Sequence, residues 1–380
     1  MKPLRIALIS PFPPFKGGIA RFSDRLRQAL EASGCEVVPV PFRRLWPRWL
    51  LKGRPTTEPG AEPPASTPLC LDLMNPFTWF SVARQLRRSR PDVLLIACWS
   101  SLLAPLVSVV RRFSGLPTVV LLHNFTSHES IPGEPMLKRL LVSSSDGFLT
   151  LSRSVESELL GFSPDARTCP LFHPLYEPQA SLPTKTDARR TLGLPKGAPM
   201  LLFFGYVREY KGLDTLLEAM AGVVRELPSA RLMVAGEFFL DSSRFREEAR
   251  RLGLADAVVF REGYVPAGEV APLMATADAV VLPYRSATQS GVAPLAFGHG
   301  VPVIACSAGG LDAQVKHGRT GWLVRKEGAE ALADGIVQFF RERDRLPLEE
   351  GIAEVCRKLS WQSFAEASIP FLERVSRRSA

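Results

Sequence analysis

The sequence of 380 residues lacks several short motifs that mark common active sites. It contains no GxSxG, no HExxH and no GxxxxGK(S/T), so nothing supports a serine hydrolase, a zinc protease or a P-loop protein. No DxD is present either, and a carboxylate-bound metal at a diphosphate is therefore not expected. The six cysteines show neither CxxC nor Cys/His ligand spacing, which argues against a disulfide framework and a zinc site and favours a reducing cytoplasm.

The chain also shows no export signal and no clear membrane span. Its first residues lead directly into a strand-like run at residues 5–12, which is too short and too structured for a signal peptide. An uncharged stretch at residues 93–110 approaches spanning length but contains three serines and Pro105. We interpret that stretch as a buried strand followed by the apolar face of a helix.

Positive charge is in excess and is unevenly placed. The formal net charge is +9, and residues 1–175 hold 21 Lys and Arg against 13 Asp and Glu. Such a field favours an acidic partner. Within it, residues 43–54 interleave tryptophan with basic side chains, which suits either an anionic membrane surface or a helix packed inward with solvated arginines. The residues that would meet a membrane are Arg43, Arg44, Trp46, Arg48, Trp49 and Lys52.

Apolar strands alternate with helical patterns along nearly the whole chain. Two stretches open in the same way. The first is a strand at residues 6–10 with Gly17 and Gly18 ahead of a helix, and the second is a strand at residues 200–204 with a helix from about Gly212. This pattern predicts two Rossmann-like α/β domains, and the length also favours two domains.

A Pro-rich segment after residue 170 marks the expected linker. We therefore expect an N-terminal domain at residues 1–172, a C-terminal domain at 173–360 and a final amphipathic helix at 361–380. Residues 53–68 are rich in Pro, Gly, Ser and Thr, which predicts a flexible insertion. That insertion is either a flexible flap on the side of the domain that would bind an acceptor substrate, or an excursion of the chain without a function.

Residues 286–305 combine a turn of small residues, a helix and a buried strand. Unpaired backbone N–H groups and the positive end of the helix dipole attract phosphate at such a turn. The alternative is an ordinary αβ unit, since such turns are common in open sheets. The backbone amides that would face the ligand are those of Thr288, Gln289, Ser290, Gly291 and Val292.

Further candidates stand where strands end. Arg208 and Lys211 follow the strand at residues 200–204, and two cations there suit a diphosphate. Gly17 and Gly18 allow the backbone to approach a ligand closely. His123 ends a strand, where it either reaches a substrate hydroxyl and helps transfer a proton or plays a structural part.

Together these motifs resemble the glycosyltransferases of the GT-B fold and are similar to the large retaining family 4, also called group 1. The resemblance covers nearly the whole chain and rests on PPFKGGIARF, LHNFTSHE, FFGYVREYKGLDTLLEAM and the long run from ADAVVLPY to RTGWLV. It implies two Rossmann-like domains facing across a cleft, with a C-terminal helix that crosses back to the first domain. The second domain would hold the nucleotide sugar and the first the acceptor.

The resemblance also implies roles for particular residues. Arg208 and Lys211 would bind the donor diphosphate, and His123 would sit by the transferred sugar. Gly17 and Gly18 would border the phosphate and sugar. The remaining residues expected around the donor are Glu237, Tyr264, Val265, Tyr284, Thr288, Gln289, Ser290, Gly291 and Val292. Such enzymes use a front-face displacement in which the departing phosphate takes the acceptor proton, so no metal or other cofactor is expected.

The chain departs from the family at two positions. Members usually carry two glutamates eight positions apart, and the matching positions here are Ala287 and Leu295. The usual carboxylate contacts to the sugar and ribose are therefore missing. Gln289, Ser290 or Tyr284 are hypothetical substitutes.

The sequence thus predicts a cytoplasmic, metal-independent, retaining glycosyltransferase of the hexosyltransferase type. It would move a sugar from a nucleotide-diphosphate donor to a lipid-linked or polysaccharide-precursor acceptor, with peripheral association at the inner membrane face. The alternative is a catalytically inert GT-B module that binds a nucleotide sugar or a partner enzyme, which the two missing glutamates motivate. A sugar-nucleotide epimerase fits the motifs less closely, and a nucleic-acid partner would explain the charge but not the strand-end residues.

Overall fold

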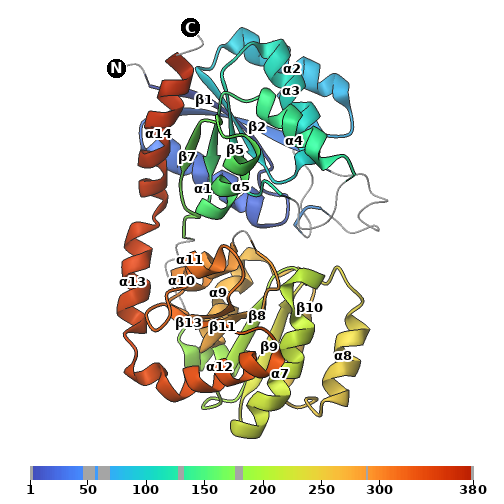
Figure 1. The fold of residues 1–380 in the computed structure, drawn as a ribbon, viewed down its shortest axis with the longest axis vertical. Helices are drawn as coiled ribbons and strands as arrows, with labels where there is room; N and C mark the ends of the chain where they lie inside the picture. Colours follow the sequence, from blue (N-terminus) through green and yellow to red (C-terminus); the bar gives the residue numbers. More distant parts are fainter. Residues whose placement is uncertain are drawn as a thin grey trace. The chain divides into compact units, whose positions relative to one another are not determined.

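The computed structural model describes residues 3–45, 56–58, 69–126, 132–175, 183–287 and 290–377. The chain divides into two compact units, shown in Figure 1. One comprises Met1–His173 and Ser360–Ala380, and the other comprises Pro174–Leu359. The chain therefore passes from one unit to the other at residues 173–174 and returns at residues 359–360.

The first unit is built on a parallel sheet. Its strands are β1 (Arg5–Ser10), β2 (Glu36–Arg44), β3 (Leu71–Asp72), β4 (Val93–Cys98), β5 (Thr118–Leu122), β6 (Gly147–Thr150) and β7 (Thr168–Pro170). They lie in the order β3-β2-β1-β4-β5-β6-β7. Every residue of β4 and β5 is buried, as expected for apolar runs that are covered on both faces of a parallel sheet.

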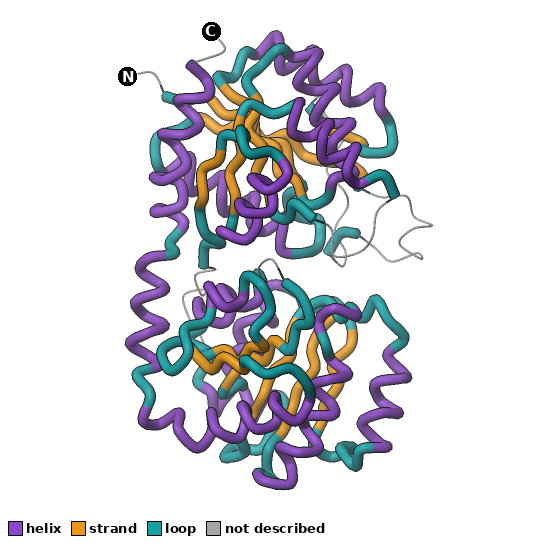
Figure 2. The backbone as a smooth tube through the Cα atoms, in the orientation of Figure 1, coloured by secondary structure: helices purple, strands orange, loops and turns teal. Residues whose placement is uncertain are grey.

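Helices flank this sheet in Figure 2. They are α1 (Gly18–Ala32), α2 (Pro76–Ser89), the 3-10 turn η1 (Ser101–Leu103), α3 (Ala104–Ser114), α4 (Glu134–Ser143), α5 (Arg153–Phe162) and α14 (Trp361–Arg377). Residues 93–110 thus form a strand followed by helix, as the sequence predicted. No helix among the described residues is long and apolar enough to cross a membrane.

The final helix α14 belongs to the first unit, where it packs on α1 and reaches β4 and β5. Its inner face is apolar and includes Trp361, Phe364 and Phe371. A side chain at Gly147 of β6 would place its Cβ 2.7 Å from the Phe371 ring, so the glycine makes room for the helix. The predicted return of a C-terminal helix is thus present, and it depends on close packing.

The second unit holds β8 (Met200–Phe204), β9 (Arg231–Gly236), β10 (Val258–Glu262), β11 (Ala279–Leu282), β12 (Val303–Cys306) and β13 (Gly321–Val324). These parallel strands lie in the order β10-β9-β8-β11-β12-β13. That is the Rossmann order, with β8 and β11 at the point where the strand order reverses. The prediction of two Rossmann-like α/β domains is confirmed.

Helices lie on both sides of this second sheet (Figure 2). They are α6 (Lys185–Thr191), η2 (Glu209–Lys211), α7 (Leu213–Glu226), α8 (Ser242–Arg251), α9 (Ala267–Thr276), α10 (Val292–Gly298), α11 (Leu311–Gln314), α12 (Ala329–Glu342), η3 (Arg343–Arg345) and α13 (Leu348–Lys358). One buried apolar layer packs α7 and α12 on the sheet, and a second packs α9 and α10 on it. Within residues 290–305, α10 and β12 are the expected helix and strand.

Three residues of the predicted insertion, Thr56, Thr57 and Glu58, are described. Thr57 forms an antiparallel bridge with Phe15, and the Lys16 N–H donates to the Thr56 carbonyl at 2.8 Å. This short piece is therefore attached to the loop that precedes Gly17. The rest of residues 53–68 lies outside the described residues.

A buried carboxylate, Asp278, joins the amino ends of β8 and β11 to α6. It forms ion pairs with Arg189 at 2.8 Å and Lys185 at 2.8 Å, and it accepts from the Met200 N–H at 2.8 Å. Burial raises the pKa of Asp278, but the hydrogen bonds from Lys185 and Met200 and the nearby positive charges outweigh it and lower the pKa to about 2. The ion pair therefore stabilises the folded state at neutral pH.

We expect Asp278→Asn to destabilise the second unit strongly, because the Arg189 guanidinium, 3% exposed, then loses its carboxylate. Breaking a buried pair in this way costs about 3–5 kcal/mol. Asp344→Asn is the matched control, since Asp344 is 90% exposed in its pair with Arg343. Urea unfolding followed by hydrogen exchange of peptides from β8 and β11 measures both variants.

The ion pair between Asp278 and Arg189 makes the stability of the folded state depend on pH. Because the folded pKa of Asp278 lies below its unfolded value of about 3.9, its contribution is complete above about pH 4 and is lost as the pH falls toward 2. The stability gap between the parent and Asp278→Asn should therefore narrow below pH 4. A gap under about 1 kcal/mol at pH 7 would contradict the structural role, since exposed pairs contribute that little.

Candidate functional site

Three glycines bring strand ends together at the reversal point of the second sheet. Gly205 directly follows β8 with φ +104, and a Cβ on Gly236 would lie 1.8 Å from the Gly205 carbonyl oxygen. Gly212 directly precedes α7, and a Cβ there would lie 2.1 Å from the carbonyl oxygen of Pro283, just after β11. Since ligands bind outside the carboxyl ends of parallel strands at such a point, this is the candidate site.

Lys211 is buried at this point, only 8% exposed. Its ammonium lies 5.3 Å from the centre of the Tyr284 ring, and a Cβ on Gly205 would be 3.4 Å from it. Within the described part of the chain, no carboxylate forms an ion pair with it. Burial lowers the pKa of Lys211, and the charge of Arg208 lowers it further against an opposing effect of Tyr210. A buried cation without a carboxylate is costly, and an anionic ligand would remove that cost.

Arg208 lies on the same short segment, immediately before η2. Its guanidinium stacks on Phe239, 4.3 Å from the ring centre, and Phe239 meets Tyr206 edge to face at 5.2 Å. Stacking on an aromatic ring suits a planar guanidinium and fixes its orientation. Phe239 follows β9, so this support comes from a neighbouring strand that the sequence pattern did not single out.

The η2 segment is fixed from the β11 side by Arg285. The Arg285 N–H donates to the Tyr210 carbonyl at 2.8 Å, and the guanidinium donates to the Glu209 carbonyl at 3.0 Å. The same guanidinium contacts Asp214 of α7 at 2.5 Å. Arg285 therefore holds the segment that carries both predicted cations, and it was not among the predicted residues.

The residues predicted to border the base follow the neighbouring strands. Glu237 comes directly after β9, and its carbonyl accepts from the Val207 N–H at 2.9 Å. Tyr264 is half-buried and Val265 is buried, and both follow β10. The Gly263 N–H donates to the Gly236 carbonyl at 3.0 Å, which links the ends of β9 and β10. These residues therefore share the sheet edge with Lys211.

The turn before α10 is more internally bonded than the sequence suggested. The Ser290 N–H donates to Gln314 Oε1 at 2.9 Å, and Gln314 Nε2 donates back to the Ser290 carbonyl at 3.1 Å. The Val292 N–H donates to Ser290 Oγ at 3.1 Å. In this structure the amides of Ser290 and Val292 are thus engaged within the protein, and their contact with a ligand stays a prediction. Thr288 and Gln289 lie outside the described residues.

Tyr284 and Ser290 were proposed as substitutes for the missing glutamates. Each is 4% exposed, and the Ser290 hydroxyl lies 3.5 Å from the Tyr284 hydroxyl. Burial raises the pKa of Tyr284 to about 12 against the lowering effect of the Ser290 hydrogen bond, so its hydroxyl stays protonated. Both side chains pack inside the unit, where they stabilise the end of β11 and the start of α10.

The two positions that lack glutamate are apolar in structure as well as in sequence. Ala287 is 6% exposed, and its carbonyl accepts from the Gly310 N–H at 2.8 Å. Leu295 lies in α10 and packs against the apolar layer beneath it. The segment is therefore fixed by backbone hydrogen bonding and apolar packing where the family usually places carboxylates.

The first unit holds the other predicted residues. Gly17 has φ +105 and precedes α1, whose first residue is Gly18. His123 directly follows β5 and is 6% exposed. Phe22 of α1 meets the rings of His123, His173 and Trp361 edge to face at 5.0, 5.3 and 4.9 Å between centres. This aromatic cluster fixes His123 and includes residues beside both chain passages between the units.

Part of the basic Trp segment can be placed. Arg43 and Arg44 end β2 and are exposed, and Arg44 forms an ion pair with Asp72 at 2.8 Å. Trp46, Arg48, Trp49 and Lys52 lie outside the described residues.

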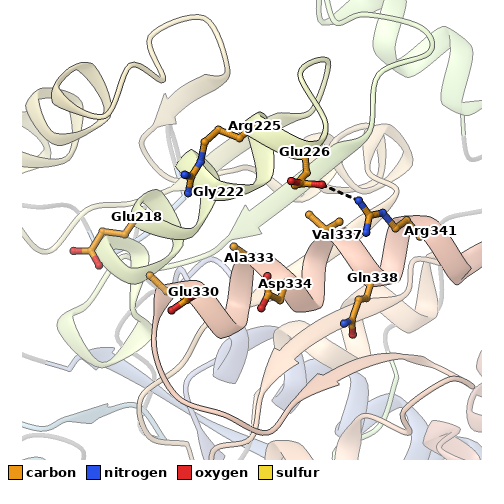
Figure 3. A pocket seen from close by; sticks show the side chains of 11 residues that line it. Glu218, Gly222, Arg225, Glu226, Glu330, Ala333, Asp334, Val337, Gln338 and Arg341 are labelled. Atoms are coloured by element: carbon orange, nitrogen blue, oxygen red, sulfur yellow. Dashed lines mark hydrogen bonds and ion pairs between the residues drawn. The ribbon is translucent and has the colours of Figure 1, made fainter.

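A hollow of about 650 Å³ on the second unit lies apart from these residues. It runs between α7 and α12, as Figure 3 shows, and is bordered by Glu226 and Arg341, which pair at 2.8 Å. A Cβ on Gly222 would lie 3.0 Å from the Ala333 Cβ, so the two helices pack closely at its floor. No predicted residue lines it. Among the described residues, no group of three His, Cys, Asp or Glu side chains is placed to hold a metal ion.

Comparison with known proteins agrees with this architecture. Residues 198–342 match the family described as Glycosyl transferases group 1, and residues 16–170 match Glycosyltransferase Family 4. A D-inositol 3-phosphate glycosyltransferase of Thermobispora bispora is 34% identical over 206 residues, covering 51% of this chain and 48% of that protein. One from Corynebacterium urealyticum is 32% identical over 187 residues, covering 47% and 44%. The chain spans about half the length of these curated relatives.

Solved structures share the fold. Sucrose-phosphate synthase from Thermosynechococcus elongatus superposes with a TM-score of 0.76 at 22% identity, covering 99% of both chains. HepE of Anabaena in complex with UDP gives 0.75 at 15% identity, covering 97% of this chain and 100% of that one. The catalytic domain of starch synthase IV from Arabidopsis thaliana, bound to ADP and acarbose, gives 0.72 at 14% identity, covering 99% and 100%.

The fold is therefore GT-B, with two Rossmann-like units and a C-terminal helix in the first. With both units matched by family models, the chain belongs to the group 1 glycosyltransferases.

The burial of His123 predicts an acid-dependent loss of stability. Burial lowers the pKa of His123 to about 3, and the charge of His173 adds to that effect, so the folded state disfavours the proton. The contribution of neutral His123 is complete above the unfolded pKa of about 6.5 and falls by about 1.4 kcal/mol per pH unit below it. We expect His123→Gln to reduce this slope in urea unfolding of the first unit between pH 6.5 and 4.

His317→Gln is the control, because the His317 ring lies against Trp322 in the second unit and not in the unit whose unfolding is followed. It should leave the slope for the first unit unchanged. Parallel stability curves for the parent and His123→Gln across that pH range would show that the ring is not held neutral.

Proposed function

We propose that this protein transfers a sugar from a nucleotide-diphosphate donor, and that the second unit binds the donor at the carboxyl ends of β8 and β11. The observation that carries the proposal is Lys211, a buried cation without a carboxylate partner in the described part of the chain, next to Arg208. Two positive charges at the reversal point of a Rossmann sheet match the two phosphates of such a donor. UDP and ADP are bound by the GT-B neighbours HepE and starch synthase IV, which supports testing these two first.

The proposed chemistry follows from the charges. The bond between the sugar C1 and the phosphate oxygen breaks, and the acceptor oxygen bonds to C1. The acceptor proton passes to the departing phosphate, which leaves as part of the nucleoside diphosphate. Lys211 and Arg208 would stabilise the negative charge that develops on that leaving group, which is where positive charge speeds the reaction most. We propose that this charge makes a metal unnecessary and that the sugar is transferred on the same face, with retention.

His123 has a limited part in this proposal. Because its pKa is about 3, the ring is neutral near pH 7 and can exchange hydrogen bonds with a sugar hydroxyl. In this proposal it supplies no positive charge, because the acceptor proton passes to the departing phosphate. Gly17 and Gly18 complete the first unit's share of the proposed donor contacts.

The acceptor is proposed to be a lipid-linked or polysaccharide-precursor molecule at the cytoplasmic face of a membrane. The basic excess of residues 1–175 supports an anionic acceptor or surface. The curated relatives carry the name D-inositol 3-phosphate glycosyltransferase, which makes a phosphorylated polyol a second acceptor class to assay.

An inert nucleotide-sugar-binding module remains the second candidate, because Ala287 and Leu295 are buried or packed where carboxylates are usual. The two candidates separate in one assay. Release of free nucleoside diphosphate from a donor only when an acceptor is supplied identifies the transferase. Donor binding without any turnover across the acceptor panel identifies the inert module.

Lys211→Met tests the donor site directly. The variant removes a buried charge but keeps a flexible apolar side chain, so the unliganded protein should become more stable, by about 1–4 kcal/mol. At a hundred times its dissociation constant, a nucleoside diphosphate should stabilise the parent by about 2.7 kcal/mol, and we expect that gain to disappear in the variant. Thermal unfolding with and without UDP or ADP measures both effects.

Lys358→Met is the matched control, because Lys358 is 66% exposed and pairs with Glu354 on α13. It should change neither the stability nor the ligand effect. A Lys211→Met protein that still gains stability from the nucleotide would exclude Lys211 from the diphosphate site.

A further inference from the structure

One exposed face of α2 is unusual for a surface helix. Phe77, Phe80, Arg84 and Arg87 are spaced by three, four and three residues, which places them along a single stripe. All four are exposed, and Phe77 is 83% exposed. The helix itself is well defined at its start, because Asn75 Oδ1 accepts from the Phe77 N–H and Pro76 occupies the first turn. The stripe is therefore presented by a regular helix.

The first half of the stripe is apolar and extends beyond α2. Phe113 of α3 is 50% exposed and meets Phe80 edge to face at 4.7 Å between ring centres. Met74, just before the helix, is 46% exposed. The helices α2 and α3 pack side by side, as Figure 1 shows. Contiguous exposed side chains of this size mark a surface that meets another molecule or a membrane.

The second half of the stripe is strongly basic. Arg84, Arg87, Arg88 and Arg90 line an open hollow of about 920 Å³ on the first unit. Across the described ranges, no acidic side chain pairs with any of these four. Asp92, which also lines the hollow, accepts from the Arg5 N–H at 2.7 Å and so is already bonded. The hollow therefore presents positive charge to whatever occupies it.

We propose that this face, termed the α2 face and defined by Met74, Phe77, Phe80, Phe113 and the four arginines, docks on an anionic lipid surface. The aromatic rings would enter the boundary between headgroups and acyl chains, and the arginines would bind the lipid phosphates. Most of the face belongs to one helix of 14 residues, which can lie flat in that boundary. None of its residues belongs to the basic Trp segment at residues 43–54.

The charge pattern favours a membrane over other partners. A polyanionic glycan would use the arginines but gives no role to a phenylalanine that is 83% exposed. A two-fold contact with a second copy would leave the four arginines without an anionic partner, since none of the residues that define the face is acidic. An anionic bilayer alone offers phosphate and hydrocarbon to adjacent halves of one stripe.

Sedimentation of the full chain with vesicles tests the proposal at about 150 mM salt, where weak surface attractions are screened. The vesicles are phosphatidylcholine alone or phosphatidylcholine with about one third phosphatidylglycerol. We expect binding to the mixed vesicles only. Arg87→Gln/Arg88→Gln should weaken it about thirtyfold, since each arginine near the surface contributes about 1 kcal/mol. Phe77→Ser should also weaken it.

Arg25→Gln is the control, an exposed arginine on α1 outside the face, and should leave binding unchanged. Trp46→Ser/Trp49→Ser tests the other candidate segment. Phe77→Trp gives a direct signal: its emission should shift to the blue with mixed vesicles and be quenched by brominated lipid. All altered side chains on α2 are exposed, so folding is verified by an unchanged melting temperature.

Four results would overturn the proposal. They are equal binding to neutral vesicles, unchanged binding in both α2 variants, loss of binding only in Trp46→Ser/Trp49→Ser, and a dimer in lipid-free sedimentation that Phe77→Ser abolishes. None of these measurements uses a donor, so the proposal can fail while the proposed transferase activity stands, and the reverse also holds.

Discussion

The buried ammonium of Lys211 is the constraint on which the candidate site depends. It lies beyond the carboxyl ends of the neighbouring strands β8 and β11, and Gly205 leaves space beside it that a Cβ would restrict. Gly212 and Gly236 let the neighbouring backbones meet there without side chains. Arg285 and Phe239 then fix the segment that carries Lys211 and Arg208. Burying the Lys211 ammonium without a carboxylate lowers the stability of the unliganded protein. Such a cost is common at a site where a bound ligand neutralises the charge.

The edge at the amino ends of the same strands holds a buried charge that is neutralised by protein groups alone. Asp278 is almost fully buried there, but Arg189, Lys185 and Arg343 all pair with it. The Met200 N–H adds a further hydrogen bond. One edge therefore neutralises its buried charge with protein groups, while the other leaves a cation for which the described residues supply no carboxylate. This contrast within one sheet supports the proposal that an anionic ligand binds at the carboxyl ends of the strands.

Local patterns made much of this predictable. The strand at residues 200–204 matches β8, and the two βα openings predicted the Rossmann units because apolar periodicity and glycine turns act over short ranges. The supports of the site were not predictable in this way. Gln314 reaches Ser290 across 24 residues, and Phe22 joins His123 to Trp361 of the last helix. Such contacts arise from the folded topology, and no spacing in a single sequence encodes them.

The Gln314 contact changes how the turn before α10 can work. A carboxylate at position 287 would be buried, and one at position 295 would meet the apolar layer. Instead, Gln314 satisfies both backbone groups of Ser290, and the Ala287 carbonyl is satisfied by Gly310. Ala287 and Ser290 are thus held by neutral hydrogen bonds. Under the proposed function, donor affinity would come mainly from contacts of Lys211 and Arg208 with the diphosphate, and selection among sugars would fall to contacts other than a carboxylate on α10.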